Sequence, residues 1–375
     1  MKCIKCNTDN KLKERTANKG RCKSCKHPIT FDPKSGSGVE FTDRFFANTI
    51  STLSVNDTLF FTRGQFYYFF NARRQKARQK SFGLLGCGLL AFGIIVLIAA
   101  ISNASFFITL VALALLTGGV LLLIPRIRKR LLSKQRKQIT VTPDQLERWL
   151  NQWMHNNGNL AKLLPAPQTA SKRADVSPEI KQYSFDRLVV CERATIAHFL
   201  IANGFHFENN CAVLSVDKYP HDLFDTVMEM LRRNPALKVY TLHDASPAGI
   251  QLPSRLAADP DWFQGSSNVQ IHDLGLLPRQ ILDKSVFVRQ APLFGNQAAS
   301  LLSGPAGASL RPEELKWLQE GNYVELESIS PKVLLRVITQ GIARSRVPGA
   351  DDALVPVSES RYGDGVYVFA YDSFG

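Results

Sequence analysis

The chain has 375 residues and a mass of 41.8 kDa, enough for two or three domains of ordinary size. Its hydrophobic share of 45% and charged share of 21% exclude a disordered or collagen-like chain. Lysine and arginine outnumber aspartate and glutamate by 46 to 32, which gives a formal net charge of +14. The location of this excess along the chain decides which partners it indicates.

Four cysteines near the N-terminus have the spacing of a zinc site. Cys3 and Cys6 form one Cys-x-x-Cys pair, and Cys22 and Cys25 form a second pair after fifteen intervening residues. Each pair offers two thiolates to a tetrahedral ion, so residues 1–35 predict a zinc ribbon with structural Zn²⁺. Because so small a domain has little core, the metal should supply most of its folding free energy. Two disulfides are the alternative, and the sequence does not choose between nucleic acid and protein as the ribbon's partner.

Residues 39–80 predict a helical region rich in aromatic side chains. Thr62 and Gln65 have the spacing of a capping box, which predicts a helix that begins at Arg63. We expect the aromatic residues of this helix to pack on the preceding helix or to lie at a lipid headgroup layer.

Residues 81–125 contain no charged residue and predict two transmembrane helices with a short outer loop. Phe82 to Ile101 and Ser105 to Ile124 are each 20 residues long, and at about 1.5 Å per residue each would span the roughly 30 Å core of a bilayer. Basic residues without an intervening acid flank the pair, at 73–80 and 126–137. By the positive-inside rule both termini would face the cytoplasm, at a plasma or inner membrane, and the flanks would contact anionic lipid headgroups.

The two flanking clusters account for twelve of the fourteen excess positive charges. The rest of the chain therefore lacks the strong basic excess that DNA binding usually leaves. Buried core helices are the alternative explanation of the apolar run, but such helices are seldom so long and so free of charge.

Residues 126–164 combine the second basic flank with an amphipathic helix. Thr142 and Pro143 predict its start. Its apolar side chains recur at helical spacing, so a neighbouring domain or a second copy of the protein must cover that face. Residues 165–180 are rich in proline, alanine and serine and predict a linker.

Residues 181–375 predict an α/β domain with a mostly parallel sheet, because short apolar strands alternate with helices. In such sheets ligands bind at the carboxyl ends of the strands, where Glu192, Asp244 and Asp273 are expected. Carboxylates at that edge can share a Mg²⁺ ion and support phosphoryl chemistry. The alternative is that these acids are loop and helix-cap residues. Glu325 and Glu327 could also approach this edge, unless they lie on an exposed strand face.

Three motifs in this domain resemble the Toprim domain of topoisomerases, primases and related nucleases. They are Leu188-Val-Val-Cys-Glu192-Arg-Ala, Leu242-His-Asp244-Ala-Ser246-Pro-Ala-Gly249 and Asp273-Leu-Gly-Leu276-Leu-Pro-Arg. The third motif is most similar to the branch that contains the type IIB topoisomerase A subunit and related defence nucleases. The resemblance covers Phe185 to Ile281 and implies that Glu192 is a metal-linked acid or base and that Asp244 is a Mg²⁺ ligand.

The sequence departs from the Toprim pattern at Ser246, where the family has a second aspartate. Serine is a weaker Mg²⁺ ligand, so either Asp273 or a water completes the site, or the domain keeps the fold without cleavage chemistry. We favour loss of cleavage because no acid replaces the missing one nearby. Type IIB topoisomerases also place a nucleophilic tyrosine ahead of the Toprim domain, and the segment that ends in Tyr67-Tyr68 resembles that motif. Packing of these rings is the simpler interpretation.

The sequence as a whole predicts a multidomain membrane protein with a zinc ribbon, a transmembrane hairpin and a Toprim-like α/β domain. Its predicted function is to engage nucleic acid or a phosphorylated ligand, with weak or lost nuclease activity. A non-catalytic scaffold that binds proteins or a second copy of itself is one alternative. An active Mg²⁺-dependent nuclease or topoisomerase-like enzyme is the other.

Overall fold

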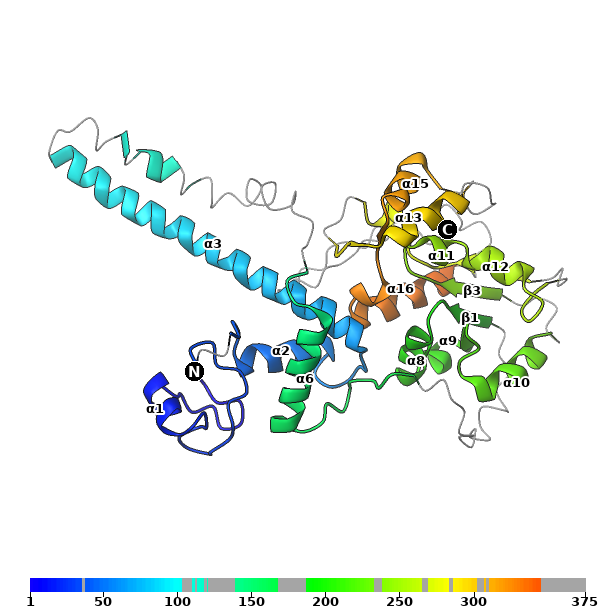
Figure 1. Cartoon of the computed structure of the whole chain (residues 1–375), viewed down its shortest axis with the longest axis horizontal. Helices are drawn as coiled ribbons and strands as arrows, with labels where there is room; N and C mark the ends of the chain where they lie inside the picture. Colours follow the sequence, from blue (N-terminus) through cyan, green and yellow to red (C-terminus); the bar gives the residue numbers. More distant parts are fainter. Residues whose placement is uncertain are drawn as a thin grey trace. The chain divides into compact units, whose positions relative to one another are not determined.

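A computed structural model gives the fold of the chain (Figure 1). It divides into two compact units, one of Met1–Phe69 with Thr142–Gly375 and the other of Phe70–Val141. The predicted basic flank at 126–137, most of the linker at 165–180 and residues 345–375 lie outside the described residues, and the predicted segment boundaries stay a prediction. The structure describes residues 1–35, 38–102, 110–111, 113–117, 120, 139–167, 187–232, 238–264, 269–282, 286–301, 307 and 310–344.

The N-terminal ribbon packs on two helices through aromatic side chains. The ribbon contains α1 (Leu12–Ala17), and the two helices are α2 (Asp43–Leu53) and α6 (Pro143–Asn157). The ring of Phe31 stacks on Trp153 at a centroid distance of 6.0 Å, and Phe41 meets Trp149 edge-on at 4.9 Å. The carboxylate of Asp43 accepts the backbone N–H of Phe31 at 2.7 Å. The ribbon and α2 therefore cover the apolar face of α6, which the sequence left to a neighbouring domain or a second copy.

Helix α3 (Arg63–Ser102) begins where the sequence predicts. Thr62 Oγ1 accepts the backbone N–H of Gln65, and Gln65 Oε1 accepts the backbone N–H of Thr62, both at 3.0 Å. This reciprocal pair is the predicted capping box. The first turns of α3 pack on α2 through Phe66 and Phe46, whose ring centroids are 5.3 Å apart. The predicted packing of the aromatic segment on the preceding helix is confirmed.

The predicted transmembrane hairpin is wrong. Among the described residues, no helix is long and apolar enough to cross a membrane. The prediction treated Phe82 to Ile101 as a separate element, whereas this stretch continues a helix that begins at Arg63. Of the second apolar stretch, the structure describes only short helical pieces between residues 110 and 120. The predicted integral-membrane fold class and the membrane localisation derived from it are corrected accordingly.

Four strands form a parallel sheet in the order β2-β1-β3-β4. Strand β1 pairs in parallel with β2 and β3, and β3 pairs in parallel with β4. The order reverses between β1 and β3, because the chain passes from β2 back across β1. The predicted parallel α/β sheet is confirmed. The strands are β1 (Arg187–Cys191), β2 (Cys211–Ser215), β3 (Lys238–Leu242) and β4 (Gln270–Asp273).

Helices cover both faces of this sheet (Figure 1). Val189 and Cys191 of β1 belong to the core on one face, together with α8 (Ala194–Ala202), α9 (Phe205–Asn209) and α16 (Pro331–Arg344). Leu188 and Val190 belong to the core on the other face, with α10 (His221–Arg232) and α12 (Leu252–Ala258). Burial on both faces explains why β1 and β2 consist mostly of apolar residues.

The segment after β4 returns to the carboxyl end of β3. It contains a two-stranded antiparallel sheet, and Val324 forms an antiparallel bridge with Ala245 just beyond β3. This bridge places Glu325 and Glu327 beside the strand end where Asp244 lies. The elements of this segment are η1 (Pro278–Gln280), β5 (Arg289–Gln290), α13 (Pro292–Leu301), α15 (Pro312–Gln319), β6 (Asn322–Tyr323) and η2 (Leu326–Ser328).

Candidate metal centre and carboxylate cluster

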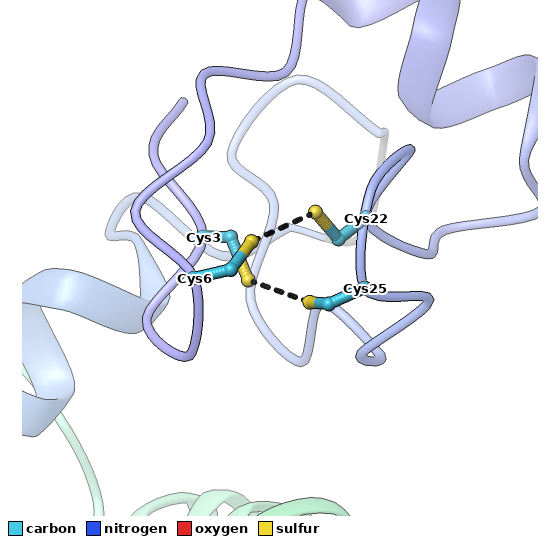
Figure 2. Close-up of side chains that lie close together, drawn as sticks. All are labelled: Cys3, Cys6, Cys22 and Cys25. Carbon is cyan, nitrogen blue, oxygen red and sulfur yellow. Dashed lines mark hydrogen bonds between the residues drawn. The ribbon is translucent and has the colours of Figure 1, made fainter.

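The four predicted cysteines lie together, two from each of two facing turns (Figure 2). The Sγ atoms of Cys3 and Cys25 are 3.7 Å apart, and those of Cys6 and Cys22 are 3.6 Å apart. A tetrahedral ion with metal–sulfur bonds of about 2.3 Å separates its sulfurs by about 3.75 Å. All four sulfurs lie within 4.8 Å of one another, so the cluster fits a Zn²⁺ ion.

The two turns repeat one backbone pattern. The N–H of Cys3 donates to the carbonyl of Thr8 at 3.0 Å, and the N–H of Cys22 donates to the carbonyl of His27 at 2.9 Å. The residue after the second cysteine of each pair has a left-handed backbone, with φ of 59° at Asn7 and 57° at Lys26. This conformation reverses the chain so that both thiols of a pair point to one centre.

The surroundings shift the pKa values of two of the thiols, those of Cys6 and Cys25, in opposite directions. The side-chain hydrogen bond between Cys6 and Thr8, with Sγ and Oγ1 3.2 Å apart, is the main cause that lowers the pKa of Cys6 to about 6. At Cys25 the backbone of His27 lowers the pKa, but desolvation and the neighbouring thiols outweigh it and raise the pKa to about 11. Bound Zn²⁺ would hold all four groups as thiolates and leave no open position for substrate, so the centre suits folding rather than catalysis.

Glu192 and Asp244 meet at the point where the strand order reverses. Glu192 directly follows β1, and Asp244 lies two residues beyond β3. Glu192 Oε2 accepts the backbone N–H of Asp244 at 2.8 Å. In open α/β sheets this reversal point is where ligands bind. The structure thus brings two of the predicted acids to the edge position that parallel topology favours.

Arg193 occupies the middle of this carboxylate cluster. Its Nη2 lies 3.1 Å from Asp244 Oδ2, and its Nη1 lies 3.0 Å from Glu327 Oε2. Asp244 also accepts the backbone N–H of Leu326 at 2.7 Å. Burial raises the pKa of Asp244 to about 7, although Arg193 opposes the shift. The pKa of Arg193 is raised because four acids surround it, although burial acts the other way.

The start of α3 supplies further contacts to the same cluster. Thr62 Oγ1 donates to Glu327 Oε1 at 2.5 Å, and the hydroxyl of Tyr68 donates to Glu325 Oε2 at 2.6 Å. Arg289 donates to the other oxygen of Glu325 at 3.2 Å. Tyr68 is buried, and burial together with Glu325 raises its pKa, which disfavours the tyrosinate that a nucleophile requires.

The other two predicted residues, Ser246 and Asp273, have different partners. Ser246 Oγ accepts the backbone N–H of Gly249 at 3.0 Å and so caps the short helix α11 (Pro247–Ile250). Asp273 Oδ1 lies 2.9 Å from Nε2 of the fully buried His243. Burial lowers the pKa of His243, but Asp273 outweighs it and raises the pKa to about 9, which favours an imidazolium–carboxylate pair.

The two candidate sites therefore differ in whether they can hold a metal. In the part of the chain that the structure describes, the four cysteines are the one group of three or more ligand side chains that could hold an ion. Sequence reasoning missed Arg193, although it directly follows Glu192 in the motif that carries the resemblance. Its position beside a strand-end acid was the available signal.

Comparisons with protein-family models, with curated proteins and with solved structures found no match to this chain. The description of both sites therefore rests on the residues and their geometry.

Proposed function

We propose that this protein engages nucleic acid without cleaving it. In this proposal the four cysteines hold a structural Zn²⁺ ion. The α/β domain keeps a Toprim-like position for Glu192 and Asp244 but lacks metal-dependent phosphodiester chemistry. The resemblance of the motifs around these two acids, and their meeting where the strand order reverses, support the Toprim-like assignment.

The position of Arg193 is the observation that carries the proposed loss of cleavage. A metal-dependent nuclease uses Mg²⁺ to neutralise its carboxylates and the reacting phosphate. Here a guanidinium already bridges Asp244 and Glu327, at 3.1 Å and 3.0 Å. A hydrated Mg²⁺ ion would have to displace this cation and leave it unpaired in a partly buried place.

The remaining predicted ligands reinforce this proposal. Ser246 has its hydroxyl engaged as a helix cap, and Asp273 is paired with His243. Neither side chain is poised beside Asp244 as a further metal ligand. A Mg²⁺ site that used Ser246 or Asp273 as a ligand would need that residue to change partners.

A nicking assay tests the proposal. Zinc-loaded full-length protein is incubated with supercoiled plasmid and Mg²⁺ or Mn²⁺, and binding of the same DNA is measured in parallel. We expect binding without nicking, and the same result for the Glu192→Gln variant. Metal-dependent nicking that disappears in Glu192→Gln would contradict the proposal and support an active nuclease. A folded, zinc-loaded protein that binds no nucleic acid would favour the protein-binding scaffold instead.

A further inference from the structure

The ribbon carries a local basic excess that the whole-chain charge conceals. Residues 1–34 contain ten lysine and arginine residues but three aspartate and glutamate residues. Outside the ribbon and the two basic clusters at 73–80 and 126–137, acids outnumber bases, so the average hides the contrast. Four thiolates around Zn²⁺ would contribute a formal charge of −2, which leaves the ribbon clearly positive.

Internal ion pairs already engage all three acids of the ribbon. Asp9 lies 2.7 Å from the N-terminal ammonium group of Met1. Glu14 pairs with Lys23 at 2.8 Å, and Asp32 pairs with the buried Arg15 at 2.6 Å. The closest partner of each acid is therefore one of these three groups rather than another basic side chain of the ribbon.

Eight basic side chains of the ribbon remain, and seven of them are exposed lysines. In the part of the chain that the structure describes, none of the eight has a carboxylate within ion-pair distance. They are Lys2, Lys5, Lys11, Lys13, Lys19, Arg21, Lys26 and Lys34, all classed as exposed. Eight exposed cations without a close carboxylate partner, on a domain that stays positive with zinc bound, create a field that attracts polyanions.

A groove of about 410 Å³ lies where the first cysteine turn meets the end of α6. Lys5 and His27 line it from the ribbon, and Asn156 and Asn157 line it from α6. His27 Nε2 lies 3.0 Å from Asn157 Oδ1, which ties the two walls together. These side chains offer hydrogen-bond donors and a positive charge, which is the chemistry that phosphate oxygens require.

The geometry points to the exposed basic side chains of the ribbon, together with the groove that Lys5 lines, as a binding surface for the phosphate backbone of nucleic acid. The inference rests on the proposed function and assigns its binding step to the ribbon. The carboxylate cluster of the α/β domain is a poor alternative, because Glu192, Asp244, Glu325 and Glu327 outnumber Arg193 and Arg289 there.

The ribbon's surface chemistry favours nucleic acid over a lipid surface. Among its large apolar side chains, Leu12 is the exposed one, at 43%, and Phe31 is buried. The described ribbon therefore has no apolar wedge for a headgroup layer and no exposed aromatic ring on which a base could stack. Binding through it is accordingly salt-dependent and insensitive to base sequence.

Fluorescence anisotropy with a labelled mixed-sequence DNA oligonucleotide tests this surface in the zinc-loaded full chain. The ribbon variant combines Lys2→Glu, Lys5→Glu and Arg21→Glu. Its matched control combines Lys316→Glu, Lys332→Glu and Arg336→Glu, which change the charge equally on exposed helix positions of the α/β domain. Zinc content and thermal unfolding confirm that both variants are folded.

The ribbon variant should weaken binding at least about tenfold at low salt and reduce the slope of log K against log salt by about two to three. The control variant should change both quantities much less. An equal loss of DNA affinity in the two variants would overturn the inference. So would binding of the protein to anionic vesicles, if added DNA did not displace them. Nicking by the protein would instead refute the proposed function and leave the ribbon result standing, so the two failures are distinguishable.

Discussion

The two candidate sites differ in how the negative charge of their clustered side chains is neutralised. In the ribbon, four sulfurs face one centre, at 3.6–3.7 Å across the two turns (Figure 2). At the sheet edge, Asp244 and Glu327 converge on the guanidinium of Arg193. The ribbon therefore requires an external cation, whereas the sheet edge carries its own.

This difference shows why carboxylates at strand ends are weaker evidence for a metal than paired cysteines. Thiolates so close together repel one another, so a cluster of four thiolates is destabilised when no metal is bound. Carboxylates can instead be neutralised by an arginine, by backbone N–H groups or by protonation. All three mechanisms act on Asp244, through Arg193, Leu326 and its raised pKa.

Removing one sulfur ligand should give the largest effect. The Cys22→Ser variant loses most of a zinc contribution that is on the order of 10 kcal/mol in small zinc domains. We expect loss of bound zinc and protease sensitivity confined to residues 1–34, measured by metal analysis and mapped proteolysis. The control Cys211→Ala removes a buried cysteine outside the cluster and should keep its zinc. Full zinc occupancy in Cys22→Ser would refute the four-ligand centre.

Removing the internal cation of the sheet edge should give the second largest effect. Arg193→Met leaves Asp244 and Glu327 buried without their partner, which should lower the free energy of unfolding by about 3–5 kcal/mol. Urea unfolding measures the loss. Adding Asp244→Asn to the variant should recover part of it, because one uncompensated charge disappears. A loss below about 1 kcal/mol would mean that the cluster does not depend on Arg193.

The buried His243–Asp273 pair should make stability depend on pH. The pKa of His243 is raised from 6.5 to about 9, so between these values the folded state binds more protons than the unfolded state. The free energy of unfolding should therefore be highest below pH 6.5 and fall by a few kcal/mol as the pH rises through about 9. Denaturant unfolding across this range should show a flatter profile for His243→Gln. An identical slope in both proteins would contradict the charged pair.

The smallest predicted change in the free energy of unfolding concerns the close contact between Glu327 and Gly64 of α3. A Cβ atom at Gly64 would overlap the carboxylate of Glu327, whereas one at Gly88 on the same helix would meet nothing within 4 Å. Gly64→Ala should lower the free energy of unfolding by about 1–3 kcal/mol, and Gly88→Ala should leave it unchanged or raise it by up to about 1 kcal/mol. Thermal unfolding compares them. Equal effects would show that Glu327 does not need this close approach.

Features that depend on neighbouring residues were predictable from the sequence. The paired cysteines lie within 25 residues of the N-terminus, and the capping box at Thr62 and Gln65 involves one turn of backbone. The parallel sheet followed from alternating strands and helices, because such crossovers force parallel pairing. Each of these inferences rested on a pattern that the sequence shows locally, even where the contact itself joins distant segments, as between β1 and β3.

Features that depend on distant residues were not predictable. Arg193 has partners at Glu325 and Glu327, more than 130 positions later. The sequence left open whether these two glutamates approach the edge or lie on an exposed strand face, because no local pattern shows that the returning segment reaches β3. The uncharged run after Ser81 led to a wrong prediction for a related reason. The composition of this segment is apolar, but a membrane span also requires a sufficiently long apolar helix in the folded chain.

Calorimetric titration of Mg²⁺ into the zinc-loaded full-length protein tests the central claim most directly, which is that Arg193 takes the place of a metal at the sheet edge. The account predicts no saturable Mg²⁺ binding in the native protein at millimolar concentrations and measurable binding in Arg193→Met. Saturable binding by the native protein that is abolished in Asp244→Asn would contradict it.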